Sequence, residues 1–277
     1  MHQRPALRFD EWTRVKPVIG MLHLAPLPGS PQASQSLAAI TERALSDAAA
    51  LAAGGCHALM MENFGDVPFY PGRVPAVVVA AMTAIAAAVR RQTPLPLGIN
   101  VLRNDGQSAL AVAIGAGAEF IRVNVLSGAR VTDQGLIQGI AHDLLRDKAQ
   151  LGATGVRILA DADVKHAAPL AARDLGDEVK DLLLRGLADA VIVSGSGTGQ
   201  PVSIAKLKTV KEAAQGRPVL IGSGATAASL AELAPYADGF IVGTALKQDG
   251  ISVNPVDPKR VREFMAAHLA SCRAHSP

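Results

Sequence analysis

Between Val191 and Lys247, three short apolar runs each end in glycine and hydroxyl residues: VIVSGSGTG (191–199), VLIGSG (219–224) and IVGTALK (241–247). Apolar runs of this length, separated by helix-like segments, are typical of buried parallel strands. Glycine lets the backbone approach a ligand closely, and consecutive N–H groups in such turns can bind an anion. Each turn alone is more typical of an ordinary strand-to-helix connection than of an anion site. Three in succession near the C-terminus favour a phosphate-binding (β/α)8 barrel.

The rest of the chain repeats the same alternation of strand-like and helix-like segments. With the three strands above, the apolar runs predict eight strands, the number that closes a parallel barrel, at 18–22, 58–61, 97–101, 120–123, 156–160, 190–193, 219–221 and 239–242. A doubly wound open sheet would carry its glycine fingerprint after the first strand, whereas here the glycine-rich turns come last. We therefore predict an α/β protein with a single TIM barrel at residues 17–272, preceded by a short N-terminal extension at residues 1–16.

The amino-acid composition limits the kinds of molecule that the protein is expected to bind. The 277 residues are 49% hydrophobic, and 27 basic against 24 acidic residues leave a net charge of only +3, without a long basic cluster. Nucleic-acid binding is therefore not expected. The two cysteines, Cys56 and Cys272, lie far apart and have no metal-ligand spacing, which fits a reducing cytoplasm.

The segment 74–89 is apolar apart from Thr83. It is shorter than the roughly 20 residues that a membrane span requires, and Val78, Met82 and Ile85 keep the spacing of a packed helix. No integral membrane segment is expected. Because the outward face of this helix is alanine rather than charged, we expect a second subunit to cover it in a homo-oligomer.

Polar side chains stand directly after the predicted strands, where a barrel places its active site. Asp161 ends an apolar strand and is the first candidate for proton transfer. Glu62 also ends a buried strand, where an unpaired carboxylate is costly. It is either a general base or half of an ion pair with Arg122 or Arg103, unless a ligand is its partner. His23 follows the first strand and either has a catalytic role or satisfies a backbone carbonyl.

Lys165 completes the predicted catalytic set, with recognition of a phosphate or carboxylate favoured over imine formation. A divalent metal held by Asp161, Asp163, His166 and Glu62 is an alternative, but their spacing is not a diagnostic metal motif, and we expect no cofactor. The loop 64–70 holds three of the eight Phe and Tyr residues and suggests a lid or a flat surface over the mouth. The alternative is an aromatic loop that packs only on its neighbours. The predicted substrate-binding residues are Asn63, Asn100, Arg103, Asn104, Arg122, Asn124 and His166, and the predicted phosphate-binding residues are Ser194, Gly195, Ser196, Gly197, Thr198, Gly222, Ser223, Gly224, Gly243 and Thr244.

Several longer motifs resemble the BtpA/SgcQ family. They span most of the chain from Pro17 to Met265 and stand at 17–31, 62–70, 100–105, 122–124, 131–135, 161–166, 242–247 and 254–258. The resemblance implies a TIM barrel of the ribulose-phosphate-binding type. It also implies two different functions, because one branch of the family is linked to photosystem I accumulation at thylakoid membranes and the other to sugar-metabolism genes.

The residues at the strand ends favour the function in sugar metabolism. We expect a cytoplasmic enzyme that acts on a small phosphorylated, sugar-like metabolite by acid/base chemistry, as an isomerase or a lyase. A non-catalytic biogenesis or assembly factor for a membrane complex such as photosystem I is the alternative, although no chlorophyll-binding pattern or membrane anchor is visible.

Overall fold

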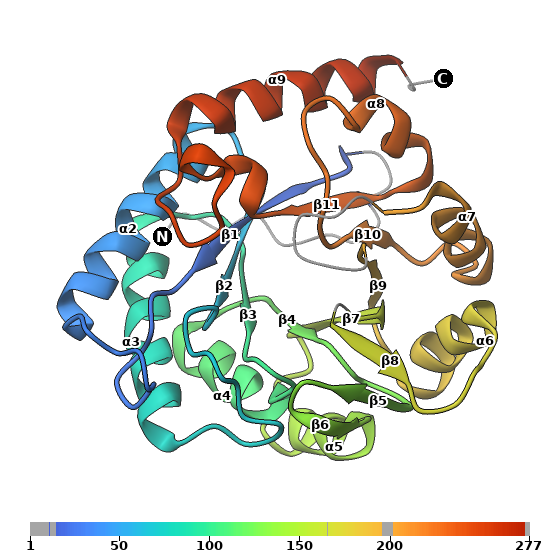
Figure 1. The fold of residues 1–277 in the computed structure, drawn as a ribbon, viewed down its shortest axis with the longest axis horizontal. Coiled ribbons are helices and arrows are strands. Elements are labelled where there is room, and N and C mark those ends of the chain that lie inside the picture. Colours follow the sequence, from blue (N-terminus) through green and yellow to red (C-terminus); the bar gives the residue numbers. More distant parts are fainter. Residues whose placement is uncertain (1–10, 12–14, 165, 196–201, 275–277) are drawn as a thin grey trace.

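Eight parallel strands close into a barrel in the computed structural model, which describes residues 11, 15–164, 166–195 and 202–274 (Figure 1). The strands are β1 (Val18–His23), β2 (Ala58–Glu62), β3 (Leu97–Asn100), β4 (Phe120–Val123), β7 (Arg157–Asp163), β9 (Ala190–Val193), β10 (Val219–Ile221) and β11 (Gly239–Val242). Their order around the ring is β1-β11-β10-β9-β7-β4-β3-β2. The predicted TIM barrel and all eight strand positions are confirmed.

Helices surround the barrel and cover its outer face (Figure 1). The described α-helices are α2 (Leu37–Ala53), α3 (Ala76–Gln92), α4 (Gly106–Ala116), α5 (Ala141–Gln150), α6 (Leu175–Lys180), α7 (Ile204–Ala213), α8 (Leu230–Leu233) and α9 (Pro258–Ala274). In α3, the predicted inward positions Val78, Met82 and Ile85 are buried. Among the described residues, no helix is both long enough and apolar enough to cross a membrane.

A small antiparallel sheet stands outside the barrel and was not predicted from the sequence. It joins the hairpin β5 (Ala129–Thr132) and β6 (Gly135–Gln138) to β8 (Ala167–Pro169). The fifth barrel strand also runs to Asp163, three residues beyond its predicted end, because the chain pairs with β9 again after an irregularity between Asp161 and Asp163. Short strands with polar residues carry too weak an alternation to be found in a sequence.

The barrel interior is filled by a separate apolar cluster of side chains that point inward from the strands. Its members are Ile19, Met21, Ala58, Met60, Phe120, Leu159, Ala190, Ile192, Leu220 and Ile241. Because side chains alternate between the two faces of a strand, the next inward positions toward the C-terminal end are polar or glycine. These positions are His23, Glu62, Asn100, Arg122, Asp161, Ser194, Gly222 and Gly243. The same alternation that fills the core therefore builds a polar layer at the mouth.

Two histidines pack together at the opposite, N-terminal end of the barrel. The His57 Nδ1 accepts a hydrogen bond from the backbone N–H of Val18 (3.1 Å), and the His268 ring meets the His57 ring edge to face at 5.6 Å. Burial lowers the pKa of His57, while burial and the neighbouring His57 lower the pKa of His268 to about 4. Both rings are therefore neutral in the folded protein at neutral pH.

This histidine pair should make the fold sensitive to acid. As the pH falls from about 6.5 toward about 4, the unfolded chain binds a proton at His268 that the folded chain does not bind. The free energy of unfolding should therefore fall by up to about 1.4 kcal/mol per pH unit for that group. Urea denaturation at several pH values would measure this slope. It should be shallower in His268→Leu and unchanged in His142→Leu, which alters an exposed ring; parallel slopes in all three proteins would contradict the assignment.

Candidate active site

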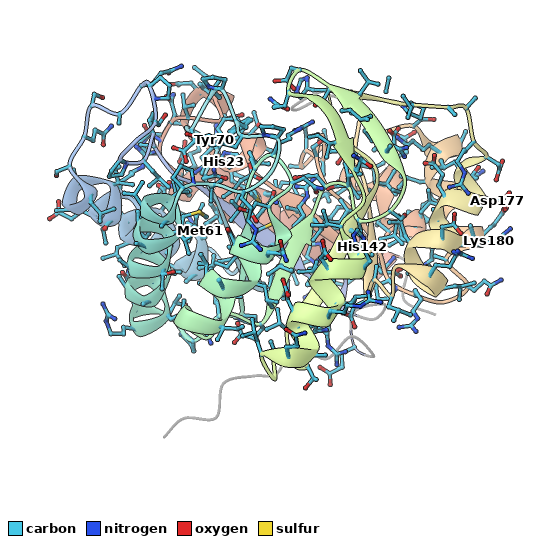
Figure 2. The ribbon with its side chains drawn as sticks, turned by 90° about the horizontal axis from the view of Figure 1, so that it is seen from below. His23, Met61, Tyr70, His142, Asp177 and Lys180 are labelled. Carbon is cyan, nitrogen blue, oxygen red and sulfur yellow. The ribbon has the colours of Figure 1, made fainter. Side chains whose placement is uncertain are left out.

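A cavity of about 760 Å³ opens at the C-terminal ends of the barrel strands. Its lining comes from both ends of the sequence, including His23 and Glu62 after β1 and β2 and Gly222–Gly224 after β10. Figure 2 shows His23 and Tyr70 among the loops on this side of the molecule, above Met61 of β2. Cavities of roughly 300–1,000 Å³ are typical of small-molecule sites, and the C-terminal face is where TIM barrels carry their chemistry.

His23 and Glu62 form a pair at this mouth. The His23 Nε2 lies 4.0 Å from the Glu62 Oε1, and both side chains are 8% exposed. Strands β1 and β2 are neighbours in which His23 and Glu62 are register partners, so the backbone itself sets this approach. Burial lowers the pKa of Arg103 and the Glu62 carboxylate opposes this effect, whereas Glu62 adds to the rise in the pKa of Arg122 that Asp161 mainly causes. A buried carboxylate among these groups can hold or exchange a proton with the imidazole.

Contacts on three sides fix the His23 ring. Its Nδ1 lies 2.9 Å from the backbone oxygen of Ser252, and its face stacks on Phe64 with ring centroids 4.4 Å apart. A carbonyl oxygen only accepts, so Nδ1 carries the proton and the Nε2 of a neutral ring presents its lone pair toward Glu62. A Cβ on Gly243 would lie 2.8 Å from the ring, so glycine is required there.

Arg122 crosses the barrel interior and is held by Asp161. Its Nε and Nη2 donate to the two Asp161 carboxylate oxygens at 3.0 and 2.8 Å, and Asn124 Nδ2 donates to Asp161 Oδ2 at 2.8 Å. Burial disfavours the charged guanidinium, but the adjacent Asp161 carboxylate outweighs this and raises the pKa of Arg122. Arg122 and Asn124 line the large cavity, whereas the Asp161 side chain has no exposed surface. This geometry favours Asp161 as the residue that positions Arg122 over the proton-transfer role expected from the sequence.

The residues predicted to bind substrate divide into two groups. Arg103, Arg122, Asn124 and His166 line the large cavity. Asn63, Asn100 and Asn104 instead connect loops and strands: Asn63 accepts from the backbone of Leu102 (2.7 Å), Asn104 accepts from the backbone of Val125 (2.8 Å), and Asn100 donates to the backbone oxygen of Arg122 (3.1 Å). An amide side chain satisfies both a donor and an acceptor, and such bonds hold the loops that surround the mouth.

The glycine-rich turns meet at the same mouth. Gly222, Ser223 and Gly224 line the cavity together with Gly243 and Thr244. Ser194 lies beside them, because a Cβ on Gly222 would be 2.7 Å from the Ser194 Oγ and 3.3 Å from the Arg122 Nη2. Gly195 is buried, while Lys165, Ser196, Gly197 and Thr198 lie outside the described residues. Gly224 adopts a φ of 77°, a conformation that favours glycine, so a bulky substitution there would also strain the backbone.

Two serine hydroxyls in these turns are buried without a partner among the described residues. Neither the Ser194 Oγ nor the Ser223 Oγ makes a hydrogen bond there. Buried polar atoms are nearly always satisfied in folded proteins, so an unpaired hydroxyl at a cavity indicates a place for a ligand or water.

Two of the carboxylates that a divalent metal would need already bind other side chains. Asp161 binds Arg122 and Asn124, while Asp163 accepts from the Lys206 ammonium at 2.5 Å. Within the described part of the chain, no group of three or more His, Cys, Asp or Glu side chains is arranged to hold a metal ion.

Ser252 is a site residue that sequence reasoning missed. Its backbone oxygen fixes His23, and its Oγ lies 2.8 Å from the Thr244 Oγ1. Ser252 follows His23 by 229 residues and belongs to no motif, so only the folded chain reveals it.

Comparison with known proteins identifies the family. The family model described as "BtpA family" matches residues 14–269. The chain belongs to the BtpA family. It is 48% identical to the photosystem I biogenesis protein BtpA of Synechocystis over 94% of this chain and 90% of that protein. It is also 48% identical to an uncharacterised protein of Thermococcus kodakarensis over 90% of this chain and 94% of the relative.

Two solved enzymes share the fold of this chain at low sequence identity. Tryptophan synthase from M. tuberculosis superposes with a TM-score of 0.59 at 17% identity, covering 96% of each chain. Phosphoribosyl anthranilate isomerase from Thermus thermophilus superposes with a TM-score of 0.55 at 14% identity, covering 92% of this chain and 98% of the isomerase. At these identities the likeness supports the barrel fold of the family and leaves the reaction to be argued from the site.

Proposed function

We propose that this BtpA-family barrel is an enzyme that acts on a small phosphorylated, sugar-like substrate by acid/base chemistry, as an isomerase or a lyase. The observation that carries the proposal is the His23–Glu62 pair, which opens into the same cavity as the glycine turns after β10 and β11. A proton-transfer pair and an anion cradle within one mouth are the two parts that such chemistry requires.

The phosphate end of the substrate lies at the glycine turns in this proposal. The unpaired hydroxyls of Ser194 and Ser223 and the backbone around Gly224 and Thr244 supply donors. The Arg122 guanidinium lies next to Gly222 and supplies positive charge from the floor of the cavity. An anion is stabilised where charged and neutral donors converge in a partly buried site.

Proton transfer takes place at the His23–Glu62 pair. The neutral His23 Nε2 accepts a proton from a carbon next to the substrate carbonyl, and the Glu62 carboxylate together with the Ser252 carbonyl stabilises the imidazolium. Arg122, held in place by Asp161, stabilises the negative charge that develops on the carbonyl oxygen. Return of the proton to a neighbouring carbon gives an isomer. Transfer of the same proton to a hydroxyl on the β-carbon, which then leaves as water while a carbon–carbon double bond forms, gives a lyase reaction.

The experiment that tests this function combines binding with isotope exchange. Inorganic phosphate should raise the melting temperature of the protein, since a ligand that binds only the folded state stabilises it. A panel of sugar phosphates incubated with the protein in D2O should contain one whose carbon-bound proton is replaced by deuterium, as detected by NMR. No stabilisation by phosphate and no exchange across the panel would contradict the proposal.

A role in assembly is the second candidate, and the Synechocystis relative favours it. That protein is named as a photosystem I biogenesis protein and is 48% identical to this chain. An assembly factor would act through exposed surfaces, of which the loop 64–70 is one, since Val67 and Tyr70 are 46% and 50% exposed.

The cytoplasmic location also remains a proposal, which rests on the two cysteines that the structure shows as free thiols.

The predicted homo-oligomer would cover the outward face of α3. This face exposes Val77 (45%) with Ala80 and Ala84, and the adjacent helix α4 exposes Ile114 (42%). Sedimentation at micromolar concentration should therefore show a species larger than the 28.6 kDa chain. Val77→Glu should shift the population toward that mass without changing the far-UV spectrum, and a wild-type protein that sediments only as a monomer would contradict the prediction.

A further inference from the structure

The order of strands around the barrel places Arg103 opposite the glycine turns. In the ring β1-β11-β10-β9-β7-β4-β3-β2, β3 and β10 are separated by four of the eight positions, as are β4 and β11. Arg103 follows β3, while Gly222–Gly224 follow β10, and all of them line the same cavity. A ligand that extends across the mouth from the glycine turns would therefore reach Arg103.

Arg103 is held in place from both sides. Its backbone N–H donates to the Tyr70 oxygen at 3.0 Å, which ties it to the aromatic loop 64–70. The next residue, Asn104, exchanges hydrogen bonds with Val125 at 2.8 and 2.9 Å, at the start of the connection to the hairpin β5–β6. Arg103 as a whole residue is only 7% exposed, so its charge lies in the wall of the cavity rather than in bulk solvent.

Burial disfavours the charged form of Arg103, and a ligand anion would help to offset this effect. Burial lowers its pKa, and the carboxylates of Asp133, Asp161 and Glu62 only partly offset this effect. A negatively charged ligand group would offset part of the free-energy cost of burying the charged guanidinium. A planar guanidinium matches a carboxylate through two parallel N–H···O bonds, whereas a doubly charged phosphate beside Glu62 would meet stronger repulsion.

We propose that the substrate is a phosphorylated sugar acid, whose carboxylate binds Arg103 while its phosphate lies at the turns after β10 and β11. This inference rests on the proposed function, which it deepens by naming a second anionic group. Glu62 is a register partner of Asn100, the last residue of β3, whereas the His23 ring lies against Gly243 after β11, so the pair stands between the two anionic ends of the substrate. The carbon that loses its proton therefore lies between the phosphate and the carboxylate of the substrate.

Matched ligands that differ only at the carboxylate test the inference. 3-Phosphoglycerate is compared with glycerol 3-phosphate, and 6-phosphogluconate with sorbitol 6-phosphate, by isothermal titration. The pairs offer two distances between phosphate and carboxylate. In at least one pair the wild-type protein should bind the acid tenfold or more tightly than the alcohol, a factor that corresponds to about 1.4 kcal/mol.

Variants then assign that preference to Arg103. Arg103→Gln should remove it while leaving the affinity for glycerol 3-phosphate and inorganic phosphate within about twofold, and Arg103→Lys should retain part of it because the charge remains. Arg91→Gln is the control for net charge, since this exposed arginine lies in the last turn of α3, away from the mouth.

The outcomes separate the two proposals. Equal binding of acid and alcohol in both pairs, with inorganic phosphate still bound, would overturn the carboxylate assignment and leave the phosphate site standing. Absence of binding by phosphate and by all four esters would overturn the phosphate cradle itself. A wild-type preference that persists in a folded Arg103→Gln protein would move the carboxylate site to another residue and refute this one. If Arg103→Gln does not fold, the wild-type comparison and Arg103→Lys still decide the question.

Discussion

Glu62→Gln should lower the rate of deuterium exchange into the phosphorylated substrate by about a hundredfold or more. The substitution keeps the size of the side chain and removes the charge that faces the His23 Nε2 at 4.0 Å. Without the carboxylate, the imidazolium loses its stabilising partner and the pair can no longer hold a shared proton. Inorganic phosphate should still bind within about threefold, because the glycine turns lie on other strands. Exchange rates by NMR and titration with phosphate measure the two effects separately.

A matched control and a cellular test make this result decisive. Glu42→Gln removes an exposed carboxylate on α2 and should leave exchange unchanged. In a Synechocystis strain that lacks its own BtpA, the assembly function predicts that a folded Glu62→Gln protein restores photosystem I as well as the wild-type chain does. It also predicts that changes in the exposed loop 64–70 abolish this restoration. That combination, together with wild-type exchange in Glu62→Gln, would refute the catalytic assignment.

Asp47→Ala should lower the free energy of unfolding by about 3–5 kcal/mol. Asp47 on α2 accepts from the Lys247 ammonium at 3.0 Å and from the backbone N–H of Val256 at 2.8 Å. Lys247 is fully buried, so removal of its partner leaves a charge without compensation in the interior. The pair also joins α2 to the segment 247–257, which contains Ser252. Urea denaturation followed by circular dichroism measures the loss.

The pH dependence of Asp47→Ala distinguishes a buried charge from lost packing. Burial already lowers the pKa of Lys247, and loss of Asp47 removes the main influence that opposes it. The deficit in stability should therefore shrink as the pH rises toward about 10, where the unfolded chain also loses this proton. As a control, Asp177→Ala breaks a pair with Lys180 on the outer surface, where Figure 2 shows both side chains, and should barely change stability. A pH-independent deficit in Asp47→Ala would show that the charge of Lys247 is not its cause.

The sequence by itself determined the architecture and the end of the barrel at which the polar residues stand. Eight apolar runs of strand length predicted the ring, and the polar residues at their C-terminal ends, among them His23, Glu62, Arg122 and Asp161, predicted a site at that end of the barrel. Both follow from the local sequence, because a barrel strand is buried on both faces and stays apolar until it reaches the mouth. The turns are also visible in the sequence as glycines, because a Cβ on Gly222 or Gly243 would collide with neighbouring side chains.

Only the tertiary structure decided which of these polar groups work together. Asp161 holds Arg122 instead of facing the cavity, Asn63 and Asn104 connect loops, and the Ser252 carbonyl orients His23 from 229 residues away. Ring closure alone places Arg103 across the mouth from Gly222–Gly224. The physical reason is that strand periodicity fixes the face and the end at which a residue lies. Pairing between strand ends instead depends on loop conformations and on distances that form only when all eight strands have closed.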